Sequence, residues 1–193
     1  VRPSLDDLGP IHWSPSPAPN FQLTKSDGGN FQLSDYKGRP VILIFYLGAS
    51  CLHCAEQLQA FAPEKENFEL AGFDIVAIST DDQTKLRQSL ADYGDKMPIP
   101  LVSNSELDVF KKFRAYDDFE KQPLHGTFLI DGDGLIRWQD IGFEPFMDHK
   151  FLLKESQRLV AQKNTGRLAS TETMNGSVVD TAEKIKPATG SEE

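Results

Sequence analysis

The sequence predicts an α/β domain with a central mixed β-sheet flanked by helices and an N-terminal β-hairpin. Segments of strand pattern alternate with segments of helix pattern, which favours a sheet covered by helices. The run Val41–Tyr46 has no polar break, as is typical of a strand that is covered on both faces. Two pairs of strand-like segments are joined by glycine-containing turns, so some strands are antiparallel and the sheet is mixed.

Composition divides the chain into three parts. Residues 1–18 are rich in proline and have no clear period, so we expect an extended arm. Residues 19–161 carry the strand and helix patterns and form the predicted domain. Residues 162–193 contain no aromatic residue and are mostly Thr, Ser, Gly, Lys and Glu, which predicts a disordered tail.

The first elements surround the strand Val41–Tyr46. Phe21–Thr24 and Phe31–Leu33 alternate apolar and polar residues on either side of a Gly-Gly turn, which predicts a hairpin. A helix follows the central strand, and Pro63 inside it should cause a kink. We expect this helix to end near Gly72.

The later elements continue the alternation of strands and helices. They are a strand at Phe73–Thr80, a helix capped by Asp81 or Asp82 and stopped by Gly94, a strand at Ile99–Val102, a helix opened by a capping box at Ser105–Asp108, a hairpin of Thr127–Ile130 and Leu135–Trp138, and a helix at Asp148–Ala161. A polar loop is predicted between the helix after Ser105 and the strand at Thr127.

The only two cysteines lie in one motif, Cys51-Leu52-His53-Cys54, between the central strand and the helix that follows. Two thiols at this spacing can close a disulfide with little backbone movement. A helix start also favours a thiolate through its free N–H groups and its dipole. The motif therefore predicts redox chemistry at Cys51 and Cys54. A structural disulfide and a pair of unreactive thiols are the alternatives.

Charge and hydropathy limit the partners. A net charge of −9 argues against nucleic acid and anionic membrane surfaces. No apolar run is long enough to cross a bilayer, so we expect a soluble chain without membrane insertion. The chain starts with Val1, which suggests a mature form or a part of a longer protein. The compartment is left open: cytoplasmic, or periplasmic or secreted if an upstream signal was removed.

Six stretches of the sequence carry a resemblance to a known family: Pro19–Leu23, Leu33–Val41, Phe45–Tyr46, the thioredoxin-type CxxC, Val76–Asp81 and Gly126–Asp131. With them the chain resembles the redoxin group of the thioredoxin superfamily, which joins the peroxiredoxins (alkyl hydroperoxide reductase and thiol-specific antioxidant proteins) with thioredoxin-like oxidoreductases. The resemblance covers about residues 19–161 and implies a thioredoxin-like fold.

The resemblance implies a thiol-disulfide oxidoreductase in which Cys51 attacks a substrate disulfide and Cys54 resolves the mixed disulfide. His53 resembles the histidine in the dithiol of protein disulfide isomerases, where an imidazolium stabilises the thiolate. His125 occupies the place of the proline that faces a thioredoxin dithiol. The catalytic residues are thus predicted to be Cys51, Cys54, His53 and His125, with no bound cofactor and an external thiol as reductant.

The alternative is an antioxidant, peroxiredoxin-like thiol peroxidase in which Cys54 is peroxidatic and Cys51 resolves. In the peroxiredoxin pattern Pro-x-x-x-Thr-x-x-Cys, the matching residues are Leu47, Cys51 and Cys54. His125 stands where that family has an arginine, and Arg114 and Arg137 are possible substitutes for it. The substrate is then a hydroperoxide rather than a disulfide-bearing protein or small thiol compound.

A third hypothesis is a metal site formed by Cys51, Cys54 and His125. Two thiolates and an imidazole suit copper(I) or zinc. The set resembles that of thioredoxin-fold copper chaperones, whose cysteines are one residue further apart. The sequence indicates neither the physiological substrate nor the oligomeric state.

Overall fold

The sheet is organised around β4 (Val41–Tyr46), whose six side chains are all buried. β4 pairs in parallel with β5 (Asp74–Ser79) and antiparallel with β9 (His125–Ile130). Because both of its faces are covered, the strand can be apolar throughout. The predicted central strand and mixed sheet are confirmed.

The computed structural model describes residues 14–93 and 97–175, and residues 163–175 through their backbone only. The chain divides into two units, Val1–Arg158 and Leu159–Glu193, and the sheet lies in the first. The other elements are β1 (Ser16–Pro17), β2 (Gln22–Lys25), β3 (Asn30–Gln32), η2 (Leu33–Tyr36), α1 (Leu52–Phe61), η3 (Ala62–Glu64), α2 (Lys65–Leu70), α3 (Gln83–Asp92), β6 (Leu101–Ser103), α4 (Asp108–Lys112), β7 (Tyr116–Asp117), β8 (Gln122–Pro123), β10 (Leu135–Gly142) and α5 (His149–Asn175). Within these residues the strands form an eight-stranded sheet of order β1-β10-β9-β4-β5-β6-β2-β3 and a separate β7-β8 ribbon.

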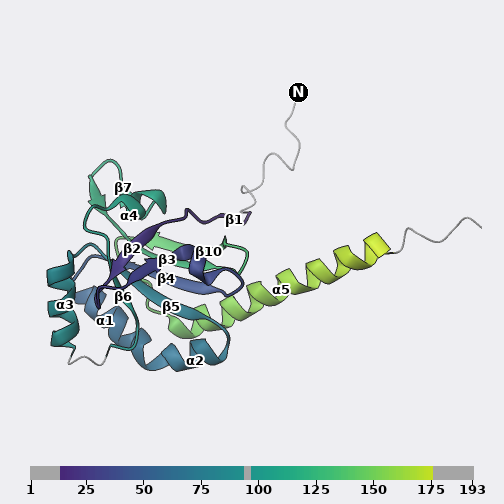
Figure 1. Cartoon of the computed structure of the whole chain (residues 1–193), viewed down its shortest axis with the longest axis horizontal. Helices are drawn as coiled ribbons and strands as arrows, with labels where there is room; N and C mark the ends of the chain where they lie inside the picture. Colours follow the sequence, from purple (N-terminus) through teal and green to yellow (C-terminus); the bar gives the residue numbers. More distant parts are fainter. Residues whose placement is uncertain (1–13, 94–96, 176–193) are drawn as a thin grey trace, which may run out of the picture. The chain divides into compact units, whose positions relative to one another are not determined.

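Aromatic side chains cover both faces of the sheet. On one face Phe45 of β4 meets Phe110 of α4 edge to face, with ring centroids 5.0 Å apart. On the other face the ring centroids of Phe61 in α1 and Phe68 in α2 lie 6.2 Å apart. Figure 1 shows α4 on one side of the sheet and α1 and α2 on the other. Each fully buried ring contributes about 1.5–3 kcal/mol, so these contacts hold the helices on the sheet.

The predicted turn, kink and cap lie where the sequence places them. The hairpin of β2 and β3 turns through Gly28, whose φ is +89°. The helix after the central strand is interrupted at Pro63, where η3 separates α1 from α2. Of the two candidate caps for α3, the carboxylate of Asp82 accepts the N–H groups of Thr84 and Lys85. The predicted stop at Gly94 lies outside the described residues.

The start of α4 differs from the predicted capping box. Leu107, which precedes the helix, has a left-handed φ of 58°, and the helix begins only at Asp108. The side-chain oxygen of Asn104 accepts the N–H groups of Val109 at 3.1 Å and Phe110 at 3.3 Å. The helix is therefore capped by Asn104, which lies one residue before the predicted motif. The turn between Asn104 and Asp108 brings this side chain to the free N–H groups of the first helical turn.

The strands near the C-terminal hairpin are longer than predicted. β10 runs to Gly142, whereas the alternating pattern ends at Trp138. The register shifts between Ile136 and Trp138, and a bulge of this kind breaks the alternation by which a strand is recognised. The predicted polar loop also contains the short β7-β8 ribbon, and the strand predicted at residues 99–102 is observed at 101–103.

The two ends of the described chain also differ from the prediction. Ser16–Pro17, at the end of the predicted arm, forms β1 and pairs with β10. Helix α5 continues to Asn175, beyond the predicted end at Ala161, and residues 162–175 include no proline that would stop a helix. Residues 1–13 and 176–193 lie outside the described part, so the three-part domain organisation stays a prediction.

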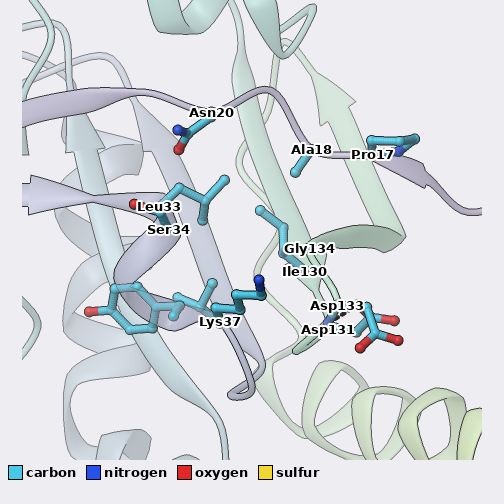
Figure 2. Close-up of a pocket in the computed structure, with 12 residues that line it drawn as sticks. Pro17, Ala18, Asn20, Leu33, Ser34, Lys37, Ile130, Asp131, Asp133 and Gly134 are labelled. Atoms are coloured by element: carbon cyan, nitrogen blue, oxygen red, sulfur yellow. Dashed lines mark hydrogen bonds between the residues drawn. The ribbon is translucent and has the colours of Figure 1, made fainter.

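A pocket of about 280 Å³ lies between the N-terminal strands and the β9-β10 turn. Ala18, Leu33, Lys37 and Ile130 are among the residues that line it (Figure 2). It adjoins the last residue of β9, whereas His125 is the first, so this pocket is distant from the dithiol. In the described part of the chain, no helix combines the length and the apolar character that a membrane crossing requires.

Candidate active site

The turn between β4 and α1 is fixed by a buried carboxylate. Gly48 has a φ of +91°, and a Cβ at this position would lie 2.6 Å from the Oδ1 atom of Asp81. The Oδ2 atom of Asp81 accepts the N–H of Ala49 at 2.7 Å. The N–H of Cys51 then donates to the carbonyl of Gly48 at 3.2 Å. Glycine lets the carboxylate lie against the backbone, and the carboxylate holds the turn that presents Cys51.

Cys51 is the N-cap of α1. Its backbone is extended, with φ −93° and ψ 108°, and its Sγ accepts the N–H of Cys54 at 3.3 Å. This is the position at which Ser, Thr or Asp usually satisfies a free N–H of the first turn. Cys51 is half-buried and Cys54 is only 1% exposed, so Cys51 is the more accessible sulfur.

The Cys54 thiol is enclosed by backbone and side-chain groups. The N–H of Leu47 donates to its Sγ at 3.2 Å. Burial, reinforced by the neighbouring Cys51 thiol, raises the pKa of Cys54 well above its ordinary value. The resting side chain is therefore a neutral thiol, whose proton needs a neighbouring acceptor.

His125 supplies that acceptor. Its Nε2 lies 3.1 Å from the Sγ of Cys54 and 3.6 Å from the Sγ of Cys51. Its Nδ1 lies 2.8 Å from the carbonyl oxygen of Phe143. A carbonyl only accepts, so we assign the proton to Nδ1, which leaves the Nε2 lone pair facing the two sulfurs. Burial lowers the pKa of His125, so the imidazole is neutral near pH 7.

The structure thus brings together three of the four predicted site residues and places the fourth at the surface. His53 is exposed, and its Nδ1 lies 3.0 Å from a carboxylate oxygen of Glu144. Among the described residues, the sulfurs contact His125 and not His53. A catalytic role for His53 remains a prediction.

The candidate arginines lie elsewhere. Arg137 pairs with Asp131 at 2.6 Å, beyond the end of β9 opposite to His125. Arg114 is exposed after α4. The described residues therefore place no guanidinium against either sulfur, and the imidazole of His125 is the nitrogen base of the site.

Two residues that shape the site were not predicted from the sequence as site residues. Asp81 follows β5, which is parallel to β4. The carboxyl ends of parallel strands lie at the same edge of the sheet, so the sequence could have predicted that Asp81 lies near the turn after β4. Buried Gln57 donates from Nε2 to the carbonyl of Phe146 at 2.9 Å, which ties the loop after β10 to α1. This loop also supplies the Phe143 carbonyl, and no sequence pattern predicts that contact.

Comparisons with known proteins identify the family of the chain. The AhpC/TSA family model matches residues 15–139. Chloroplastic peroxiredoxin Q of Oryza sativa subsp. japonica is 34% identical over 124 residues, which cover 64% of this chain and 56% of that protein. A putative peroxiredoxin of Mycobacterium tuberculosis (strain H37Rv) is 36% identical over 127 residues, which cover 62% of this chain and 78% of that protein.

The solved structures include similar folds. Peroxidoxin BcpB from Mycobacterium tuberculosis has a TM-score of 0.66 and 22% sequence identity, with 75% of this chain and 95% of that chain covered. The mitochondrial 2-cys peroxiredoxin from Plasmodium falciparum also has a TM-score of 0.66. The match to the plant protein spans a little over half of that protein's length. The resemblance and the thioredoxin-like fold predicted from the sequence are confirmed.

Proposed function

Because the chain belongs to the AhpC/TSA family, we propose that it is a thiol-dependent peroxidase in which Cys54 reduces a hydroperoxide and Cys51 resolves the product. One observation carries the assignment of roles: the N–H of Leu47 and the Nε2 of His125 both face the Sγ of Cys54. Cys54 also matches the final cysteine of the peroxiredoxin pattern. Of the two sequence-based readings, the family relationship favours the alternative over disulfide exchange.

The first step is proton transfer from Cys54 to His125 followed by attack on peroxide. The Cys54 thiolate attacks one oxygen of the O–O bond, so an S–O bond forms and the O–O bond breaks. The departing alkoxide or hydroxide takes the proton held on Nε2, which gives a sulfenic acid and an alcohol or water. Burial favours the neutral thiol and imidazole, so the reactive thiolate is a minor species at rest.

The second step closes a disulfide within one helical turn. The Sγ atoms of Cys51 and Cys54 and the nearer nitrogen of His125 all lie within 4.8 Å of one another. An S–S bond of about 2.05 Å therefore needs only a local approach of the two sulfurs. Cys51 attacks the sulfenic sulfur, water leaves, and an external thiol then reduces the disulfide in two exchange steps.

Thiol-disulfide exchange, with Cys51 attacking and Cys54 resolving, is the second candidate function. The observation in its favour is exposure, since Cys51 is half-buried while Cys54 is 1% exposed. A bulky protein disulfide would meet Cys51 first. A small peroxide is less restricted by this burial, because it needs less space than a protein disulfide to reach Cys54.

A side-by-side assay separates the two functions. The reduced protein is mixed with hydrogen peroxide in one series and with insulin disulfides in another. Stoichiometric loss of peroxide, faster than with a free thiol, is the expected result, together with slow insulin reduction. Rapid insulin reduction with peroxide loss no faster than that of a free thiol would assign the chain to disulfide exchange instead.

A further inference from the structure

We propose that the reduced dithiol and His125 form a binding site for one thiophilic d10 cation, zinc(II) or copper(I). The inference goes beyond the peroxidase function and does not depend on it. The cluster that carries it comprises Cys51, Cys54 and His125, whose ligand atoms lie within 4.8 Å of one another. Thiolate and imidazole are the ligands that these soft and borderline ions prefer.

The spacing of the ligand atoms is close to that of a metal site. With metal–sulfur and metal–nitrogen bonds of about 2.3 and 2.05 Å, a tetrahedral centre separates sulfur from nitrogen by about 3.6 Å. The Nε2 of His125 lies 3.6 Å from the Sγ of Cys51 and 3.1 Å from the Sγ of Cys54. The contact between His125 and Cys54 has to lengthen by about half an ångström, and the sulfur–sulfur separation of about 3.8 Å that a tetrahedral ion requires lies within the 4.8 Å that bounds the cluster.

The imidazole is already oriented for ligation. The contact of Nδ1 with the Phe143 carbonyl fixes the tautomer, so Nε2 offers a lone pair toward both sulfurs. Metal-binding histidines commonly have such a partner on the other ring nitrogen, which holds the ring and increases its basicity. The Phe143 carbonyl thus supports His125 as a ligand as well as a base.

Binding requires no oxidation. Each thiol releases its proton to solvent as its metal–sulfur bond forms, and Nε2 donates its lone pair. Two thiolates neutralise zinc(II), which suits the buried side of the site, and the half-buried Cys51 side leaves room for a water as fourth ligand. Copper(I) is satisfied by the three protein ligands alone.

Metal and peroxide compete for the same electron pairs. A Cys54 sulfur bonded to a cation no longer offers a free thiolate to peroxide, so the metal-loaded protein is expected to resist oxidation. The site would then bind a cation in its reduced form and release the cation when Cys51 and Cys54 form a disulfide.

The test is anaerobic titration of the reduced, metal-free full chain with zinc(II) and, separately, with copper(I), each against a coloured competing chelator. We expect one ion per chain for at least one of the two metals. Cys54→Ser should abolish binding, and His125→Gln should weaken it at least about tenfold. His149→Gln, which changes an imidazole outside the site, should leave the affinity unchanged. Equal affinity in His125→Gln, or no competition by either ion, would overturn the proposal.

X-ray absorption of the wild-type, metal-loaded protein gives a second test that needs no variant. Two sulfur ligands and one imidazole nitrogen are expected around the ion, and a shell without sulfur contradicts the site. Peroxide consumption is measured on the metal-free protein in parallel. Metal binding without peroxidase activity would reject only the proposed function, and peroxidase activity without metal binding would reject only this inference.

Discussion

Replacement of Gly48 by alanine tests whether Asp81 holds the turn before Cys51. The substitution forces alanine to a φ of +91°, which costs about 1–2 kcal/mol, and places a Cβ 2.6 Å from the carboxylate. To relieve the overlap Asp81 has to move and lose its bond to the Ala49 N–H. Such a bond to a charged group contributes about 1.5–3 kcal/mol. Alanine also makes the unfolded chain less flexible than glycine does, which offsets about 0.4–1 kcal/mol of this loss in stability.

We therefore expect Gly48→Ala to lower the free energy of unfolding by about 2–4 kcal/mol, measured by urea denaturation. Gly28→Ala is the matched control, because Gly28 has a φ of +89° and its Cβ would meet nothing within 4 Å. Gly28→Ala has the cost of the left-handed backbone without any overlap of the Cβ, so it should lower the free energy of unfolding by only about 1 kcal/mol. If Gly48→Ala costs no more than Gly28→Ala, the carboxylate does not hold the turn.

Three further predictions follow from individual contacts. Replacement of His125 by glutamine should lower the single-turnover rate of peroxide reduction about 10²–10⁴-fold, because the base that accepts the Cys54 proton is lost; an unchanged rate would contradict this role. Burial raises the pKa of Tyr46 above its ordinary value near 10, so the folded state keeps this proton while the unfolded state releases it above pH 10. The stabilising contribution of the buried phenol should therefore be complete below pH 10, and the free energy of unfolding should fall by up to about 1.4 kcal/mol per pH unit above it. The fall should be less steep in Tyr46→Phe. Equal dependence on pH in the two proteins, measured by urea denaturation, would refute this. Gln57→Leu should lower the free energy of unfolding by about 1–3 kcal/mol, because the Phe146 carbonyl loses its donor. Gln59→Leu, on the exposed side of α1, should change the free energy of unfolding little. Similar losses in both variants would show that the contact of Gln57 with Phe146 does not stabilise the fold.

Most of the fold follows from local patterns in the sequence. The apolar run of β4 predicts its position between two strands, and Pro63 predicts the break between α1 and α2. Patterns fail where a long-range contact replaces the local signal. Asn104 caps α4 across a left-handed residue, and the bulge in β10 hides the second half of that strand.

The site was predictable to a lesser degree. The spacing of Cys51 and Cys54 indicated redox chemistry, and the family resemblance placed His125 opposite the dithiol. The orientation of the histidine side chains could not be predicted from the sequence. Whether His53 or His125 faces the sulfurs depends on the first turn of α1 and on the loop after β10, and these are set by tertiary contacts such as that of Gln57.

The roles proposed for Cys54 and Cys51 are tested most directly by locating the sulfenic acid. Reduced Cys51→Ser and Cys54→Ser proteins are treated with one equivalent of hydrogen peroxide in the presence of a sulfenic-acid trap, and the modified residue is identified by mass spectrometry. Rapid trapping is expected at Cys54 in Cys51→Ser, and no trapping is expected in Cys54→Ser. Trapping at Cys51 in Cys54→Ser, with an unreactive Cys54 in the other variant, would contradict the assignment and make Cys51 the attacking sulfur.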